Sequence, residues 1–206
     1  MDALIEHGVA ARAFPGENVS GDRPMVKLVP NGVLIAAVDG LGHGVAAGIA
    51  AGIAVATLED HAGEEPEALV QRCHQVLKGT RGVVMSLASI DVREGKMAWL
   101  GVGNVDGLLL RTAGSPPTRE ALLMRGGVVG DQLPPLRTAY LPIAAGDLLI
   151  FTTDGIRSDF ATRLSLIDPL LRHQDVQEIA DRILARFGKT TDDALVLVAR
   201  YLEAAP

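Results

Sequence analysis

Runs of apolar residues divide the N-terminal part of the chain into three short segments with strand character. They cover residues 5–14, 25–29 and 33–38, and a turn containing Asn31 and Gly32 separates the second from the third. Asn-Gly is a strong signal for a two-residue β-hairpin loop, because both residues accept the positive φ angles that such a loop needs. The pattern therefore predicts a first strand followed by a hairpin closed at Asn31-Gly32.

The pattern changes to helical character at the next segment. Residues 45–59 are rich in Ala and Gly, and Gly44, Gly48 and Gly52 recur four residues apart, which places them on one face of a helix. This stripe of glycines predicts a helix that lies close to a neighbouring backbone. Residues 66–78 read as a second helix, with acidic residues near its N-terminal end where the helix dipole favours them.

Most of the remaining chain reads as strands joined by short turns. They are expected at residues 83–91, 96–101, 107–111, 121–125, 137–141, 148–153 and 194–201. Residues 112–118, with two prolines, predict a loop, and the amphipathic segment 175–187 predicts a helix. Because strands outnumber helices and mostly join through short turns, we predict antiparallel sheets with helices packed outside, an α+β layered fold. No repeat or linker divides the chain, so we expect one domain over residues 1–206.

Composition and net charge agree with a single globular domain and argue against two kinds of binding partner. The 206 residues are 48% hydrophobic, which suits one core, and the formal net charge is −6. That charge argues against a nucleic-acid-binding surface and against a polybasic contact with a membrane. The longest apolar stretch, residues 45–58, is shorter than the ~20 residues of a membrane span.

The single cysteine and the start of the chain indicate where the protein works. The first residues are acidic where a secretory signal peptide carries positive charge. A lone thiol, Cys73, fits a reducing cytoplasm, so we expect a cytoplasmic protein. Cys73 could be a nucleophile, but nothing around it resembles a cysteine-protease signature, which favours a small buried residue on a helix.

Aspartates stand where several predicted strands end or begin. Asp39 and Asp154 each follow an apolar strand, whereas Asp192 and Asp193 immediately precede the last one. In an antiparallel sheet the C-terminal end of one strand lies beside the N-terminal end of its neighbour, so these acids can share one edge. The predicted hairpin loop sets Pro24 opposite Asp39, which places Asp22 just beyond, at the same edge.

A cluster of carboxylates is unstable alone, because like charges raise one another's pKa values or demand a cation. All-oxygen ligands without a Cys or His pattern favour Mg²⁺ or Mn²⁺ over zinc. At Gly40, which follows Asp39, the missing Cβ leaves room for a metal to approach the backbone carbonyl. Any single Asp-Gly pair is also an ordinary turn sequence, so the metal hypothesis depends on the whole set of acids.

These residues carry a resemblance to the PPM (2C-type) metal-dependent serine/threonine phosphatases, especially the SpoIIE/RsbU/RsbX branch. The matching pieces follow the family's order and are Ser20-Gly21-Asp22, Asp39-Gly40-Leu41-Gly42-His43-Gly44, Gly101-Val102-Gly103-Asn104, the block from Asp147 to Gly155, and Thr191-Asp192-Asp193-Ala194. Each piece alone is a weak signal. In this order, and spread over nearly the whole chain, the set is specific.

The resemblance implies a β-sandwich of two antiparallel sheets flanked by helices, in α-β-β-α layers, with two Mn²⁺ or Mg²⁺ ions at one edge. Asp39 would bridge the two ions and the Gly40 carbonyl would bind one of them. Asp154 and Asp192 would hold the other ion. Asp22 would bind directly or through water.

The chemistry implied by the resemblance is hydrolysis of phosphoserine or phosphothreonine by a metal-activated water. Asp39, Asp154 and Asp192 would be catalytic through that water, and Asp193 would take an adjacent role beyond the ligands. His43 has two readings: it could act as a general acid or phosphate contact, or it could cap or pack at the start of the helix.

Two features depart from the family pattern. No arginine near the N-terminus is an evident phosphate ligand, and the candidate Arg12 is equally well read as an exposed strand residue. Ser158 stands where many relatives carry an acid and Asp159 follows it, so a third-metal role for Asp159 stays open.

The short chain, and the stretch from Asp154 to Phe160, most resemble the stand-alone RsbX type of this branch. That resemblance implies a phosphorylated STAS-domain protein of the stressosome as substrate, in resetting a bacterial stress response. Two alternatives stay open: a metal-dependent phosphohydrolase of small phosphate esters, and a non-catalytic binding module of the same fold. Retention of the four principal acids argues against the second.

Overall fold

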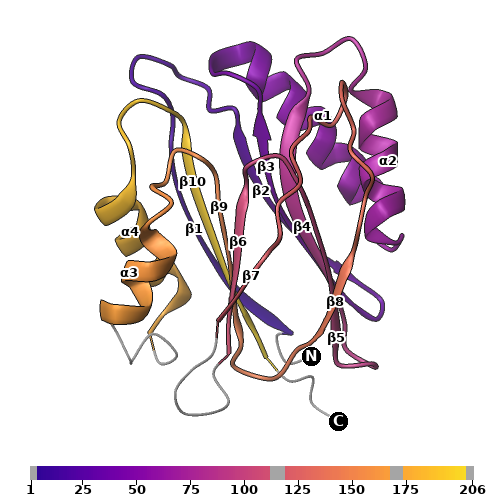
Figure 1. Cartoon of the computed structure of the whole chain (residues 1–206), viewed down its shortest axis with the longest axis vertical. Helices are drawn as coiled ribbons and strands as arrows, with labels where there is room; N and C mark the ends of the chain where they lie inside the picture. Colours follow the sequence, from indigo (N-terminus) through magenta and orange to yellow (C-terminus); the bar gives the residue numbers. More distant parts are fainter. Residues whose placement is uncertain (1–3, 112–118, 168–173, 203–206) are drawn as a thin grey trace.

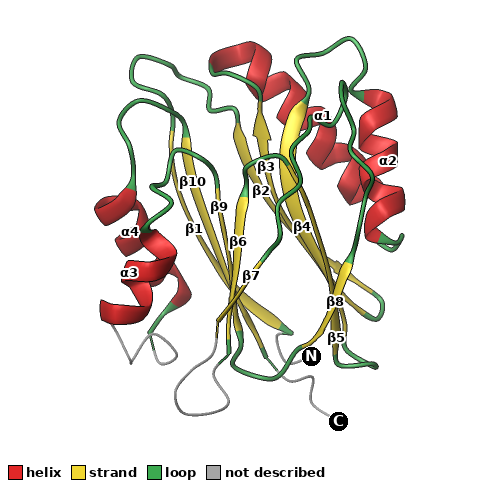
Figure 2. Cartoon of the chain, viewed as in Figure 1, coloured by secondary structure: helices red, strands yellow, loops and turns green. Residues whose placement is uncertain are grey.

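Two antiparallel five-stranded sheets stand face to face in the computed structural model, and helices cover the outer face of each (Figures 1 and 2). The structure describes residues 4–111, 119–167 and 174–202. The first sheet has the order β1 (Ile5–Arg12), β10 (Ala194–Tyr201), β9 (Leu148–Thr152), β6 (Asp106–Leu110) and β7 (Arg119–Ala121). The second has the order β2 (Asp22–Val29), β3 (Gly32–Gly40), β4 (Val83–Asp91), β5 (Lys96–Val102) and β8 (Ala139–Pro142).

The helices complete an α-β-β-α sandwich, as predicted. Helices α1 (Gly44–Asp60) and α2 (Pro66–Val76) lie on the second sheet, and α3 (Phe160–Ile167) and α4 (Val176–Phe187) flank the first (Figure 1). Within the described ranges, no helix is both long and apolar enough to cross a membrane. Cys73 is buried in α2, and burial raises the pKa of its thiol to about 12, which keeps it protonated and unreactive.

Three apolar layers hold the sandwich together, and strand β3 contributes to two of them. Its residues Val33, Ile35 and Ala37 face the other sheet, whereas Leu34, Ala36 and Val38 face α1 and α2. A strand buried on both faces needs a continuous apolar run, which explains the sequence from Val33 to Val38. Between the sheets, the rings of Trp99 and Phe151 meet edge to face with centroids 6.3 Å apart.

The hairpin between β2 and β3 corrects the predicted register. Its two loop residues are Pro30 and Asn31, so Val29 pairs with Gly32 and Asp22 faces Asp39 directly. Proline suits the first central position of a type I turn, and no described non-glycine residue has the positive φ that the predicted loop required. Each residue of β2 therefore pairs with a β3 residue two positions earlier than predicted. Because side chains alternate between the faces of a strand, this shift keeps every side chain on its predicted face.

Gly32 serves the neighbouring strand instead of the turn. A Cβ at this position would lie 1.7 Å from the backbone oxygen of Ile90 in β4. The sequence correctly predicted a two-residue hairpin near Asn31-Gly32. The glycine itself, however, is required by the close approach of β3 and β4 and not by the turn.

The predicted glycine stripe on α1 is partly wrong. Gly48 does approach the backbone of Ser20, but Gly52 faces open space. The face of α1 that packs on the sheet and on α2 carries instead Ala47, Ala50, Ala51, Ala54 and Leu58. Alanines allow the close packing that was expected of glycines.

Three further segments differ from the prediction or lie outside the described residues. The strand expected at residues 121–125 forms only as β7, Arg119–Ala121, and helix α3 was not predicted. The loop expected at residues 112–118 lies outside the described ranges. The other predicted strands and helices are present, with ends that shift by a few residues.

The close approach at Gly32 generates a prediction about stability. Gly32→Ala should destabilise the fold by about 2 kcal/mol or more, because the new methyl group must push two paired strands apart. For a domain of this size that corresponds to a loss of roughly 4–8 °C in Tm, measurable by differential scanning calorimetry. Gly63→Ala is the matched control, since a Cβ there meets nothing within 4 Å. Equal Tm values for both variants would contradict the packing argument.

Candidate metal centre

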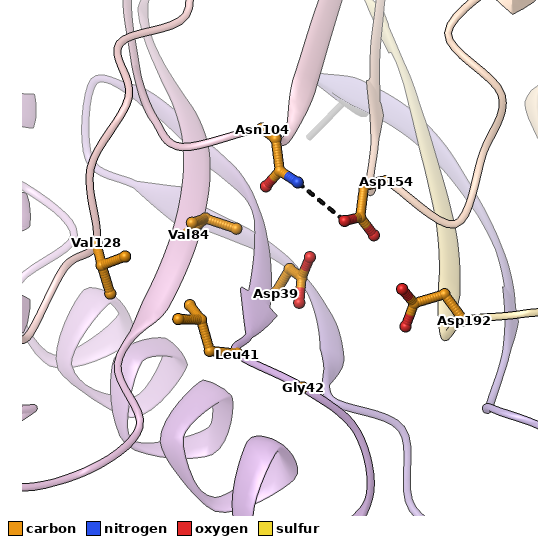
Figure 3. A pocket seen from close by; sticks show the side chains of 8 residues that line it. All are labelled: Asp39, Leu41, Gly42, Val84, Asn104, Val128, Asp154 and Asp192. Carbon is orange, nitrogen blue, oxygen red and sulfur yellow. Dashed lines mark hydrogen bonds between the residues drawn. The ribbon is translucent and has the colours of Figure 1, made fainter.

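The strand-end acids meet at one edge of the sandwich, where β3 ends and β10 begins (Figure 1). A cavity of about 220 Å³ opens there. It is lined by Asp39, Leu41, Gly42, Val84, Asn104, Val128, Asp154 and Asp192 (Figure 3). The edge was predicted from strand ends alone, and the structure brings three of the predicted ligands into this one cavity.

The cavity has an acidic side and an apolar side. The carboxylates of Asp39, Asp154 and Asp192 approach one another from the end of β3, the turn after β9 and the loop before β10 (Figure 3). Leu41, Val84 and Val128 form the opposite wall. The cavity can therefore hold cations at one side and apolar atoms of a substrate at the other.

Asn104 is a site residue that the sequence reasoning did not single out, although it belongs to the matched segment 101–104. Its Nδ2 donates a hydrogen bond of 2.9 Å to Oδ2 of Asp154 (Figure 3). This bond restrains the Asp154 carboxylate on the acidic side of the cavity. An amide two residues after the end of a strand, β5, was the available signal.

Asp22 lies behind the cavity and is only 4% exposed. Its Oδ2 accepts a hydrogen bond of 2.7 Å from the hydroxyl of Thr153, which in turn accepts one from the backbone N–H of Leu195. Burial raises the pKa of Asp22 to about 7; the Thr153 hydrogen bond opposes this rise, and neighbouring carboxylates add to it.

Asp39 is the most perturbed acid of the cluster. Burial raises its pKa to about 9, and the carboxylate of Asp22, paired with it across β2 and β3, is the next cause. No described residue donates a hydrogen bond to the Asp39 side chain. The pKa of Asp192 is also raised, by burial first and then by Asp154. Without a cation, the raised pKa values favour the protonated form of these three acids. A bound cation would instead stabilise their ionised carboxylates.

Asp193 is not among the residues that line the cavity, and its side chain binds a loop. Its Oδ1 accepts a hydrogen bond of 2.7 Å from the backbone N–H of Phe14, and its Oδ2 accepts one of 2.8 Å from Gly21. Both carboxylate oxygens are therefore used in binding the loop before β2. This loop carries Glu17, which contacts His43.

His43 is held at the rim by two contacts. Its ring stacks on Phe14 with centroids 4.2 Å apart, and its Nδ1 lies 3.0 Å from Oε1 of Glu17. It makes no side-chain cap at the start of α1. The contact with Glu17 selects the tautomer protonated at Nδ1 and leaves Nε2 without a hydrogen-bond partner among the described residues.

The remaining candidates lie outside the cavity lining. Arg12 donates a hydrogen bond to the backbone oxygen of Lys189. Asp159 forms ion pairs with Arg157 and Arg163, at 3.3 and 2.9 Å. Lys189, which the sequence reasoning missed, donates a hydrogen bond of 2.6 Å to the backbone oxygen of Asp154. Arg12 and Lys189 thus support the segment that carries the Asp154 carboxylate.

The glycines that follow the acids also have a packing role that the sequence did not predict. A Cβ on Gly40 would lie 2.2 Å from the backbone oxygen of Ala47 in α1. A Cβ on Gly155 would lie 1.8 Å from the backbone oxygen of Asp193. The missing side chains therefore allow α1 and the start of β10 to pack against the acid-bearing segments, which draws the acids together.

The donor set suits Mg²⁺ or Mn²⁺, although no group of three or more Asp, Glu, His or Cys side chains in the described ranges forms a complete metal cage. Mg²⁺ commonly binds through one or two carboxylates and keeps several waters, so a complete protein cage is not required. A half-buried Asp39 to which no described residue donates a hydrogen bond, and which shares the cavity with two other carboxylates, fits such an ion.

The raised pKa values predict how stability depends on pH. Folded Asp22 and Asp39 hold protons that the unfolded chain releases above pH ~4, so without divalent cations Tm should fall as pH rises towards 7 to 9. Asp39→Asn should flatten this fall, and Mg²⁺ should raise the Tm of the wild type more than that of the variant. Differential scanning fluorimetry with EDTA or Mg²⁺ measures both effects. Exposed Asp60→Asn is the control, and an identical pH slope in Asp39→Asn would refute the assignment.

Comparison with known proteins agrees with this geometry. The family model for stage II sporulation protein E (SpoIIE) matches residues 30–202. The chain is 24% identical to phosphoserine phosphatase RsbX of Bacillus subtilis (strain 168) over 188 aligned residues. The aligned part covers 90% of this chain and 89% of RsbX.

Solved structures show the same fold. One is described as "The bacterial stressosome: a modular system that has been adapted to control secondary messenger signaling". It is 32% identical in sequence and superposes with a TM-score of 0.86, over 96% of this chain and 100% of the other chain. The crystal structure of RsbX in complex with magnesium is 22% identical, covers 98% of this chain and 97% of its own, and has a TM-score of 0.82. The chain therefore belongs to the SpoIIE family and is a PPM-type phosphatase domain.

Proposed function

We propose that this protein is a Mg²⁺- or Mn²⁺-dependent phosphatase that hydrolyses phosphoserine or phosphothreonine in a protein substrate. The observation that carries the proposal is the convergence of Asp39, Asp154 and Asp192 on one cavity. The match to the SpoIIE family supports it, as does the likeness to a phosphoserine phosphatase over nearly the whole chain.

Five residues of this site would hold two metal ions. They are Asp39, Asp154, Asp192, Asp22 and, through its backbone carbonyl, Gly40. Bound there, the ions would lower the pKa of a coordinated water and neutralise charge that develops on the phosphoryl group.

The surrounding residues position these ligands and the substrate. Asn104 restrains the Asp154 carboxylate and Thr153 restrains that of Asp22, so two acids are set in place before a substrate binds. The Glu17 contact and the ring of Phe14 orient His43. When its ring is doubly protonated, Nε2–H can donate a proton to the leaving serine oxygen, and the neutral ring that results keeps its proton at Nδ1. The apolar wall excludes water from the opposite side of the cavity.

The proposed substrate is a phosphorylated STAS-domain protein of the stressosome type, whose dephosphorylation would reset a bacterial stress response in the cytoplasm. The RsbX likeness, and the 32% identity to a protein described with the bacterial stressosome, support this choice. The formal net charge of −6 agrees with a protein partner better than with nucleic acid or an anionic membrane.

The ligand assignment is tested by substitution. Asp39→Asn and Asp154→Asn should each reduce phosphate release from a phosphoserine protein by about 1,000-fold or more, because each removes a charge that orients the activated water. Far-UV circular dichroism should remain that of the wild type. Asp60→Asn, an exposed residue at the far end of α1, is the matched control. Near-normal turnover in both site variants would remove the metal assignment.

Metal dependence and substrate class are tested together. EDTA should abolish phosphate release, and excess Mn²⁺ or Mg²⁺ should restore it. A panel of phosphorylated STAS-domain proteins should be dephosphorylated faster than small phosphate esters such as p-nitrophenyl phosphate. Failure to release phosphate from any phosphoprotein with excess Mn²⁺ would overturn the proposal, and faster turnover of the small esters would favour a small-molecule phosphohydrolase.

A further inference from the structure

An exposed guanidinium lies beside the mouth of the acidic cavity. It belongs to Arg81, in the loop between α2 and β4. A Cβ placed on Gly42, which lines the cavity, would lie 2.7 Å from Nη1 of Arg81. Gly42 has a φ of 84°, so both its backbone conformation and this contact exclude a side chain at that point. The guanidinium therefore reaches the backbone of Gly42, which lines the cavity.

Arg81 is uncommitted, in contrast to other cations of this region. Arg12 donates to the backbone oxygen of Lys189, and Lys189 donates to that of Asp154. Arg157 is paired with Asp159. Among the described residues, the Arg81 side chain has neither a hydrogen-bond partner nor an ion pair, although several carboxylates lie in the adjoining cavity. It is free to bind an anion that enters there.

The backbone that carries Arg81 is held on both sides. The Thr80 hydroxyl accepts a hydrogen bond from the backbone N–H of Gly82 and donates one to the oxygen of Leu77. The backbone oxygen of Gly82 accepts one from Leu41, and Val83 exchanges two with Val129. These bonds tie the Arg81 loop to Leu41 and to Val129, which follows Val128, at the apolar side of the cavity. Only the side chain remains to be ordered when a ligand binds, which limits the entropic cost of binding.

The charge distribution indicates what such an arginine would bind. The cavity gathers three carboxylates, so metal ions placed among them leave little positive charge for a phosphoryl dianion. A guanidinium is a cation that presents two parallel N–H groups, and these match two phosphoryl oxygens. We propose that Arg81 binds the non-bridging oxygens of the substrate phosphoryl group, an inference that rests on the proposed phosphatase function.

The test compares Arg81→Ala and Arg81→Lys with the wild type. Arg81→Ala should lower kcat/KM by about 10- to 100-fold, the range expected for loss of a charge-assisted hydrogen bond. The loss should be equal for a phosphoserine peptide and for p-nitrophenyl phosphate, because the two share only the phosphoryl group. Inhibition by inorganic phosphate should weaken by a similar factor, while the Mn²⁺ concentration for half-maximal activity stays unchanged. Arg81→Lys should recover part of the loss.

Arg93→Ala is the matched control. Arg93 is an exposed arginine in the turn between β4 and β5, at the opposite end of the sheet from the cavity, and its substitution should change none of these quantities. Unchanged phosphate inhibition in Arg81→Ala would overturn the proposal. So would a loss confined to the peptide substrate, which would place Arg81 in contact with the peptide and not with the phosphoryl group.

A binding measurement separates this proposal from the proposed function. Calorimetric titration of inorganic phosphate in the presence of Mg²⁺ should show affinity that is about 10-fold or more weaker in Arg81→Ala, with Tm close to that of the wild type. If the wild type releases no phosphate from any substrate, the phosphatase proposal fails, and this titration still decides the role of Arg81. Equal phosphate affinity in wild type and Arg81→Ala rejects it.

Discussion

The electrostatic conflict between Asp22 and Asp39 governs the functional edge of this protein. The two carboxylates face each other across neighbouring strands, and like charges in that position repel. Burial adds to the cost of ionising both, which raises the pKa of each well above its ordinary value. A positive charge brought to this edge would relieve the conflict, so a cation that bound there would also stabilise the fold.

The surrounding structure holds the acids together against this repulsion. Thr153 and Asn104 each donate a side-chain hydrogen bond to one of the carboxylates, and Asp193 uses both its oxygens to bind the loop before β2. Gly40 and Gly155 allow backbone segments to approach at distances that any side chain would prevent. The apolar layers on both sides of each sheet then resist the separation of these segments.

The rim of the cavity differs from its floor. The floor carries the acids and is suited to cations, whereas the rim carries His43 on the loop that follows β3 and Arg81 on the loop that follows α2. His43 is oriented by Glu17 and Phe14, which lie in the loop held by Asp193. Arg81 is positioned through the hydrogen bonds of its neighbours Thr80, Gly82 and Val83. The floor is thus suited to metal chemistry, and the rim to recognition of the group that reacts.

Much of the fold and of the candidate floor could be predicted because the signals are local. Strand β10 and helix α1 follow from continuous apolar runs, and the placing of Asp39, Asp154 and Asp192 at one edge follows from the antiparallel arrangement alone. The family match over residues 30–202 agrees with motifs that were visible in the sequence.

The remaining features depend on contacts between segments that are distant in the chain. The β2–β3 register differs from the prediction because Ile90, almost 60 residues away, approaches Gly32, and Pro30 rather than Asn31 begins the turn. The pairing of Glu17 with His43 and the position of Arg81 beside Gly42 have no signature in local sequence. The sequence by itself determined which residues could bind metal and at which edge. The tertiary structure decided which side chains support and surround them, because only packing brings separate loops into contact.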